Sequence, residues 1–383
     1  MKKTIFKAVL LSVIVALAVI SCATSPQDNP LYDTTGTKGS PNSAGGRDSG
    51  REAVLNEQQR QQQTREQEQK AQVQRQQEDY ASIPAEPENS FSFELTSKGD
   101  GIKITGYKGT TKEVRIPSSI QDFPVLEING FTRNTTITSV VIPPGVTAIG
   151  DRLFQGCTNL ASVVIPNSVT SIGTEAFKDC VNLASVNRFP RWIGASAFQG
   201  CRLLTGTIDL NGNTVGNNAF AGTGFSAVRI SLSGEFPHET EVARPGRSVF
   251  ADCLNLREAT IVGTNLGNTR QAFRGGEETI REISVPEGLF SGCTALTTVN
   301  LSRVSGISAR VFSGCTSLTD IAIPESVTQI GDGAFAGCFS LTTITIPESV
   351  TRIRFSSGAF SGCSGLSLRA QARLKQLGYD GSF

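Results

Sequence analysis

A phenylalanine recurs at a nearly constant interval through the C-terminal part of this 383-residue chain. In most copies a cysteine follows three residues later, and a Leu-x-x-Ile-x-Ile segment follows the cysteine, as in Phe312–Pro324. Repetition with a period of 20 to 50 residues is typical of units that stack in a row. The chain is therefore expected to form an elongated array of about eleven units. The spacing is about 22 residues, and the phenylalanines are Phe131, Phe154, Phe177, Phe198, Phe220, Phe250, Phe273, Phe290, Phe312, Phe335 and Phe360.

The pattern inside one unit predicts mainly β structure. Leu318–Ile323 alternates apolar and polar residues, which is the period of a half-buried strand. Pro324 cannot donate to a β ladder and so ends the strand. The following Val-Thr-x-Ile-Gly predicts a second short extended segment, with the glycine supplying a turn. The Ala-Phe-x-x-Cys section is expected to form coil or 3-10 segments on the convex side that place ring and thiol inward.

These motifs resemble the BspA-like, or Treponema-type, leucine-rich repeats. The segment Ser171–Cys180 reads Ser-Ile-Gly-Thr-Glu-Ala-Phe-Lys-Asp-Cys and matches the coil of that family, and Ile323-Pro324 matches its strand end. The resemblance covers roughly residues 91–383. It implies a leucine-rich repeat solenoid in a bacterial surface lipoprotein, associated with adherence to extracellular-matrix components, attachment and host interaction.

Both ends of the array are predicted to be capped, because a solenoid exposes apolar surface at its ends. Residues 91–130 are expected to form an N-terminal β cap with the first partial repeat, residues 131–365 the solenoid, and residues 366–383 a C-terminal helical cap. The predicted helix places three apolar residues on one face and ends at a glycine. These residues are Ala370, Leu374, Leu377 and Gly378.

The first 21 residues have the pattern of an export signal. Lys2 and Lys3 precede the apolar run Ala8–Ile20, which is too short to cross a hydrocarbon core of about 30 Å. Val19–Cys22 resembles the lipobox of bacterial lipoproteins. The resemblance implies cleavage before Cys22 and attachment of lipid to its sulfur, which would anchor the chain to a membrane. The alternative is an ordinary signal peptide followed by an incidental cysteine.

Residues 22–90 are predicted to be a tether. Ala23–Gly50 is polar and rich in Ser, Gly, Asn and Pro, a composition typical of disorder. Arg51–Tyr80 is rich in Gln and lacks the heptad seam of a coiled coil, so a solvated helix is expected there. Ala23, directly after Cys22, differs from the aspartate that retains lipoproteins at the inner membrane in some bacteria. This difference favours the outer membrane or cell surface.

Composition argues against several kinds of site. The net charge of +1 gives no basis for nucleic-acid binding, and the single histidine, His238, leaves no set for a histidine triad or a multi-histidine metal centre. No cofactor and no metal are expected, and the chain is not expected to be an enzyme.

Eight cysteines occupy one repeat position. Stacked neighbours would lie about 5 Å apart, a distance that permits disulfides, and export permits oxidation. However, Asn134, Thr223 and Gly276 fall at equivalent positions and leave the cysteines in odd groups. We therefore expect a buried ladder of thiols that pack as core. The cysteines are Cys157, Cys180, Cys201, Cys253, Cys293, Cys315, Cys338 and Cys363.

The middle of the array is where the repeat becomes irregular. The step from Phe220 to Phe250 is 30 residues, with an insertion near Ser231–Arg247, and the step from Phe273 to Phe290 is 17 residues, which predicts a shortened coil. Outward strand positions are charged here, whereas they are small and neutral in several other repeats. Insertions in repeat proteins often lie at binding faces. The alternative is neutral drift with ordinary solvated charge. The candidate protein-binding residues are Arg229, Arg257, Glu258, Arg281 and Glu282.

Together these features predict a surface-exposed lipoprotein whose repeat domain binds proteins, an adhesin for host extracellular-matrix or neighbouring-cell components. The alternative is a periplasmic or envelope scaffold lipoprotein with an endogenous partner. The sequence leaves the ligand and the oligomeric state open.

Overall fold

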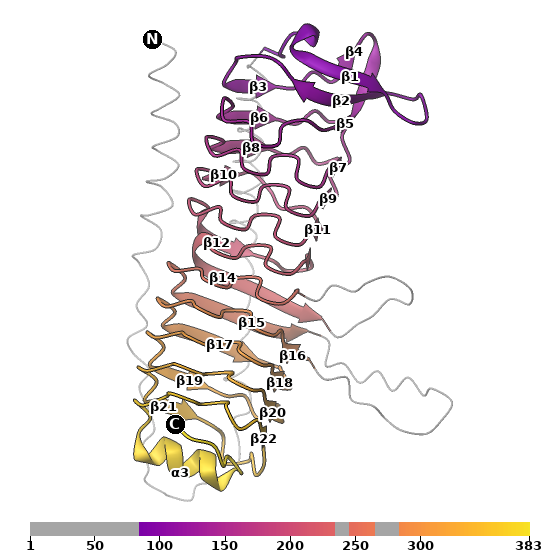
Figure 1. Ribbon diagram of the computed structural model, residues 1–383. Helices are drawn as coiled ribbons and strands as arrows, with labels where there is room; N and C mark the ends of the chain where they lie inside the picture. The colour runs from indigo at the N-terminus through magenta and orange to yellow at the C-terminus, as the bar shows by residue number, and fades with distance from the viewer. Residues whose placement is uncertain (1–83, 234–244, 265–282) are drawn as a thin grey trace, which may run out of the picture. The chain divides into compact units, whose positions relative to one another are not determined.

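The computed structural model describes residues 84–233, 245–264 and 283–383 (Figure 1). The chain divides into two units, Met1–Glu78 and Asp79–Phe383, and all described residues belong to the second. The predicted signal peptide, Cys22 and nearly all of the predicted tether lie outside the described residues.

The second unit is a β solenoid in which most described turns contribute strands to two parallel ladders (Figure 1). The first face, as we name it, consists of three sheets with strand orders β10-β8-β6-β3, β12-β14-β15-β17 and β19-β21. Its strands are β3 (Glu113–Arg115), β6 (Ser139–Val141), β8 (Ser162–Val164), β10 (Ser185–Val186), β12 (Thr205–Asp209), β14 (Gly224–Ser233), β15 (Glu258–Thr264), β17 (Thr298–Ser302), β19 (Asp320–Ala322) and β21 (Thr343–Thr345).

The second face consists of two-residue strands in two sheets, with orders β13-β11-β9-β7 and β16-β18-β20-β22. It corresponds to the second extended segment that the Val-Thr-x-Ile-Gly pattern predicts. Its strands are β7 (Ala148–Ile149), β9 (Ser171–Ile172), β11 (Trp192–Ile193), β13 (Thr214–Val215), β16 (Ser284–Val285), β18 (Gly306–Ile307), β20 (Gln329–Ile330) and β22 (Arg354–Phe355).

A column of buried phenylalanine rings runs through the core. Neighbouring rings have centroids 5.0 to 6.1 Å apart, within the range of favourable aromatic pairs. Each ring thus takes part in the contact between consecutive turns. The column consists of Phe131, Phe154, Phe177, Phe198, Phe220, Phe250, Phe290, Phe312, Phe335 and Phe360.

The column contains ten rings, so the predicted repeat on Phe273 is not a turn of its own. Phe273 itself lies outside the described residues, but the rings of Phe250 and Phe290 are 6.1 Å apart. The N–H of Phe250 also donates to the carbonyl oxygen of Leu289, and β15 pairs directly with β17. Nothing separates these two turns. The predicted shortened coil is therefore wrong: a single long repeat runs from Phe250 to Phe290.

The thiol ladder is confirmed. All eight repeat cysteines are free and buried. Each Sγ donates to the carbonyl oxygen of the column phenylalanine in the preceding turn, at 3.0 to 3.3 Å. The cysteines form odd groups of three and five, and Cys253 is not isolated, because Cys293 occupies the next turn. Where cysteine is replaced, Asn134 instead accepts N–H groups of its own turn and Thr223 donates to Phe220.

The repeated glycine after the second strand is required by close packing rather than by a special turn conformation. A Cβ on Gly194 would lie 2.6 Å from the backbone of Gly173, and one on Gly216 would lie 2.4 Å from the backbone of Ala195. Real Cβ contacts do not reach such distances, so a side chain here would push neighbouring turns apart. Gly150, in the first full turn, has no such neighbour.

The predicted N-terminal β cap is confirmed. Its sheet has the order β1-β2-β5-β4, formed by Phe91–Leu95, Ile102–Tyr107, Phe123–Ile128 and Ser119–Ile120. The ring of Tyr107 stacks on Phe131 at 5.6 Å and so joins the cap to the phenylalanine column. The preceding 3-10 helix η2 (Glu88–Ser90) and Glu86 also contact the cap, and the N–H of Glu86 donates to Arg115.

The predicted C-terminal helical cap is confirmed as α3 (Leu368–Gln376) (Figure 1). Ser367 accepts from the N–H of Ala370 and caps the helix N-terminus. Gly378 follows the helix with a φ of 104°, a conformation that glycine adopts without steric cost. The buried face of this cap closes the phenylalanine column and consists of Ala370, Leu374, Leu377 and Tyr379.

Candidate protein-binding face

The structure brings three of the five predicted binding residues together on the first face. Arg229 lies on β14, Glu258 begins β15, and Arg257 precedes it; all three side chains are exposed. The parallel register pairs Arg229 with Thr260 and Ala227 with Glu258, so that Arg229 and Glu258 are diagonal neighbours on adjacent strands. Arg281 and Glu282 lie outside the described residues.

The backbone holds these side chains firmly. The carbonyl oxygen of Arg257 accepts N–H groups of Thr297 and Thr298, both at 3.0 Å, and the N–H of Arg257 donates to Ser226 at 2.8 Å. Within the described residues Arg229, Arg257 and Glu258 form no ion pair with one another. A rigid backbone with unpaired, solvated charges is an arrangement that can meet charges on a partner.

The first face is wider here than elsewhere in the described solenoid. Strand β14 has ten residues and β15 has seven, whereas β19 and β21 have three each. The reason is visible in the sequence: proline ends the shorter strands after Ile323 and Ile346, but Ser231 and Val262 follow the equivalent Ile230 and Ile261.

The ends of these two strands are neighbours. Ser233 pairs with Thr264, and the chain passes beyond the described residues after each of them. The two long repeats, from Phe220 and from Phe250, thus leave the same sheet from adjacent positions. The predicted insertion near Ser231–Arg247 is in part strand, since β14 continues to Ser233.

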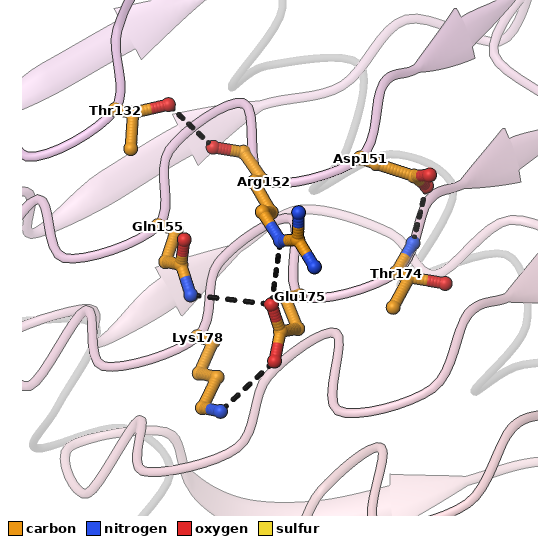
Figure 2. Close-up of polar contacts among 7 residues, drawn as sticks. All are labelled: Thr132, Asp151, Arg152, Gln155, Thr174, Glu175 and Lys178. Carbon is orange, nitrogen blue, oxygen red and sulfur yellow. Dashed lines mark hydrogen bonds and ion pairs between the residues drawn. The ribbon is translucent and has the colours of Figure 1, made fainter.

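A polar network on the coil side joins two consecutive turns, those of Gly150 and Gly173 (Figure 2). The Nε of Arg152 lies 2.8 Å from Oε2 of Glu175, and Nζ of Lys178 lies 2.9 Å from Oε1. Gln155 also donates to Glu175, at 3.3 Å. Hydrogen bonds from Arg152 and then Lys178 are the main causes that lower the pKa of Glu175.

The same network includes two contacts to the backbone. Oδ1 of Asp151 accepts the N–H of Thr174 at 2.7 Å, and the hydroxyl of Thr132 donates to the carbonyl oxygen of Arg152 at 2.8 Å (Figure 2). Apart from the Lys178–Glu175 pair, which lies within one turn, each of these contacts crosses between turns, so the network acts as a brace. The sequence analysis missed it. The signal was the repeat register, because Arg152 and Glu175 both lie two residues after the glycine of their turn.

Cys157 and Cys315 are not activated as nucleophiles. Burial is the main cause that raises the pKa of Cys157 to about 11 and that of Cys315 to about 12, so both stay protonated at neutral pH. In the described part of the chain, no three His, Cys, Asp or Glu side chains gather as metal ligands. Nor does that part contain a helix long and apolar enough to cross a membrane.

The model of the BspA type leucine rich repeat region matches six copies in the chain, over residues 125–236, 188–289 and 246–367. These matches cover more than half of the 383 residues. The chain belongs to the BspA-type leucine-rich repeat family. Its fold, with stacked parallel strands and few helical residues, agrees with this membership. A comparison with curated proteins gave no match.

Solved structures of bacterial leucine-rich repeat proteins are similar to this BspA-type chain. A leucine rich cell surface protein from Faecalibacterium prausnitzii is 25% identical, with 79% of this chain and 99% of that chain covered and a TM-score of 0.37. The leucine rich repeat protein of T. pallidum is 24% identical, with 78% and 99% covered and a TM-score of 0.28. The pneumococcal vaccine antigen PcpA is 14% identical, with 79% and 98% covered and a TM-score of 0.35.

Proposed function

We propose that this protein is a lipid-anchored bacterial surface protein whose solenoid binds a host extracellular-matrix protein or a protein of a neighbouring cell. The observation that carries the proposal is the widened part of the first face. There the two longest strands, β14 and β15, present exposed Arg229, Arg257 and Glu258 without ion pairs among the described residues. A repeat solenoid offers an extended surface of this kind to protein partners.

The anchor in the proposal comes from the sequence. Val19–Cys22 has the lipobox pattern, and lipid chains on Cys22 would hold the protein at a membrane. Replacing Cys22 with Ala is expected to move the protein from the membrane fraction to the soluble fraction of cells. Retention of the Cys22→Ala variant in membranes would contradict lipid anchoring at this residue.

Location is tested by treating intact cells with protease and blotting for the solenoid, with a periplasmic protein as control. Cleavage of the solenoid while the control survives supports the surface protein. Protection until the cells are permeabilised contradicts it and favours the alternative, an envelope scaffold with an endogenous partner.

Binding is tested with the purified full chain on a panel of immobilised extracellular-matrix proteins. The double variant Arg229→Glu, Arg257→Glu is expected to weaken binding by at least about tenfold, because charge reversal turns attraction into repulsion. The matched control is Arg310→Glu, an exposed arginine on the coil side. Unchanged binding by the double variant would show that this face is not the binding surface.

A further inference from the structure

Apolar side chains occur at one corner of the solenoid in several turns, where each turn enters its first-face strand. We define this corner as the two residues after the repeat cysteine. The corner is polar or small at Thr158-Asn159 and again at Thr294-Ala295. Between these turns it carries half-buried Val181 and the exposed Leu203 and Leu254, which are 48% and 60% exposed.

The turn between the two leucines lacks this corner. Strand β14 begins at Gly224, directly after Thr223, which occupies the cysteine position. A Cβ on Gly224 would lie 2.3 Å from the carbonyl oxygen of Arg202, so glycine lets the strand start close beneath the preceding turn. Leu203 and Leu254 therefore come from the two flanking turns, with no corner residues between them.

Arginines accompany the leucines. Arg202 directly precedes Leu203, and Arg257 follows Leu254 by three residues; both arginines are exposed. Neither forms an ion pair within residues 84–233, 245–264 and 283–383. Exposed leucines scattered singly need no explanation, but here they are combined with unpaired cations on turns that depart from the repeat.

We infer that this basic–apolar corner, consisting of Arg202, Leu203, Leu254 and Arg257, binds an acidic protein segment in which apolar side chains alternate with carboxylates. The inference rests on the proposed protein-binding function and adds the chemistry of the partner. Guanidinium groups pair with carboxylates in two parallel hydrogen bonds, and arginine is enriched at protein interfaces. Covering the leucines removes apolar surface from water, a gain that a purely polar segment does not provide.

The test uses the full chain in detergent and three synthetic peptides, with binding measured by fluorescence anisotropy at low and high salt. The first peptide alternates Asp or Glu with Leu or Phe. The second replaces its acids with Lys, and the third replaces its apolar residues with Ser. The first peptide is expected to bind, more weakly at high salt, and the other two at least about tenfold more weakly.

Three variants locate the site. Leu254→Ser and Arg257→Glu are each expected to weaken binding of the first peptide by at least about tenfold. The matched control is Phe339→Ser, since Phe339 is 57% exposed and occupies the same corner position after Cys338. It is expected to leave binding unchanged. Circular dichroism checks that all three variants are folded.

Equal binding of the three peptides, no binding of the first, or an equal loss in Phe339→Ser would overturn the inference. The proposed function fails separately. If the acidic peptide binds at the corner but no matrix protein does, the inference about the corner is supported and the proposed matrix ligand is contradicted. If matrix binding is lost in the Arg229→Glu, Arg257→Glu variant yet unaffected by Leu254→Ser, the proposed function is supported and the apolar contact of the partner with Leu254 is contradicted.

Discussion

Individual residues in this solenoid are constrained most where consecutive turns touch. The clearest case is the glycine that recurs after the second-face strand, which we call the glycine column and which includes Gly173, Gly194 and Gly216. These glycines leave room for the backbone of the preceding turn, since a Cβ on Gly194 would lie only 2.6 Å from the backbone of Gly173. The sequence showed that glycine recurs, but it suggested a turn. Only the distance between turns reveals that the requirement is steric.

Gly194→Ala is expected to destabilise the solenoid by about 2 kcal/mol, because the added methyl group overpacks a contact between two backbones. Thermal or urea unfolding of the purified protein measures the change. Gly150→Ala is the matched control: the residue has the same place in its turn, but a Cβ there meets nothing nearer than 3.6 Å. If Gly194→Ala and Gly150→Ala lower the stability equally, steric contact between turns is not the reason that glycine recurs at this position.

Burial is also expected to protect the thiols from chemical modification. The eight buried cysteines of the native protein are expected to resist alkylation by iodoacetamide near neutral pH and to react once the protein is unfolded in urea. Counting alkylated cysteines by mass spectrometry checks this. Rapid labelling of Cys157 or Cys315 in native protein would contradict the buried ladder.

Stability should therefore fall at alkaline pH. Burial raises the pKa of Cys157 from 9.0 to about 11, so the folded state favours the protonated thiol. The stabilisation is fully present below about pH 9 and is lost as the pH rises through 11. A Cys157→Ala variant is expected to show a shallower decline in its urea midpoint across this window, and an identical decline would argue against this thiol as a contributor.

Among the elements, two arginines make polar contacts where the regular strand pairing stops, one at the C-terminal end and one between two sheets of the first face. In α3, Arg373 donates to the carbonyl oxygens of Pro347 and Val350 at 3.0 and 2.9 Å. Arg188 makes the same pair of bonds to Pro166 and Val169, both at 2.8 Å, at the break between the sheets of β10 and β12. Both arginines thus fasten a proline turn where regular strand pairing stops.

Arg373→Met is expected to cost about 2 kcal/mol, since it removes two hydrogen bonds from a charged donor and takes that donor from the carbonyl oxygen of Val350, while Pro347 keeps the N–H of Val350 as a partner. Limited proteolysis should then cut first at the C-terminal cap. Arg369→Met provides the control, because Arg369 is exposed on the same helix. Equal protease sensitivity of the two variants would contradict a fastening role for Arg373.

The elements themselves were largely predictable. The strand pattern, the helix that begins near Leu368 and the cysteine position follow from periodicity, which reports local burial. The β cap follows instead from the need to cover the apolar end of a solenoid. The number of turns did not follow. The phenylalanine spacing around Phe273 imitates a repeat, and only the direct contact of Phe250 with Phe290 shows that the chain makes one turn there. For the candidate site, the charges were predicted, whereas the neighbourhood of Leu203 and Leu254 follows only from the structure, because β14 begins at Gly224 and leaves the turn between them without corner residues.

At the scale of the whole molecule, each turn contacts its neighbours in the row. Replacing residues 265–282 with a short Gly-Ser linker, matched to the connection Arg303–Ser305 between β17 and β18, is therefore expected to leave the fold intact. The far-ultraviolet circular dichroism should be unchanged, and the free energy of unfolding should change by less than about 1 kcal/mol. Loss of cooperative unfolding would show that the replaced residues are part of the stack.

The hydrogen bonds between turns have a mechanical consequence. They run along the row, from Phe154 to Ala176 and from Phe177 to Ala197, so a force applied at the two ends of the solenoid passes through every interface between turns. The weakest interface opens first, and a terminal turn, which has a neighbouring turn on one side only, has the fewest bonds to lose. Each turn released adds about 22 residues of chain, roughly 75 Å when extended. If the proposed membrane anchor and a bound partner hold its two ends, such a protein would lengthen in steps, and each step would lower the tension on the proposed binding face.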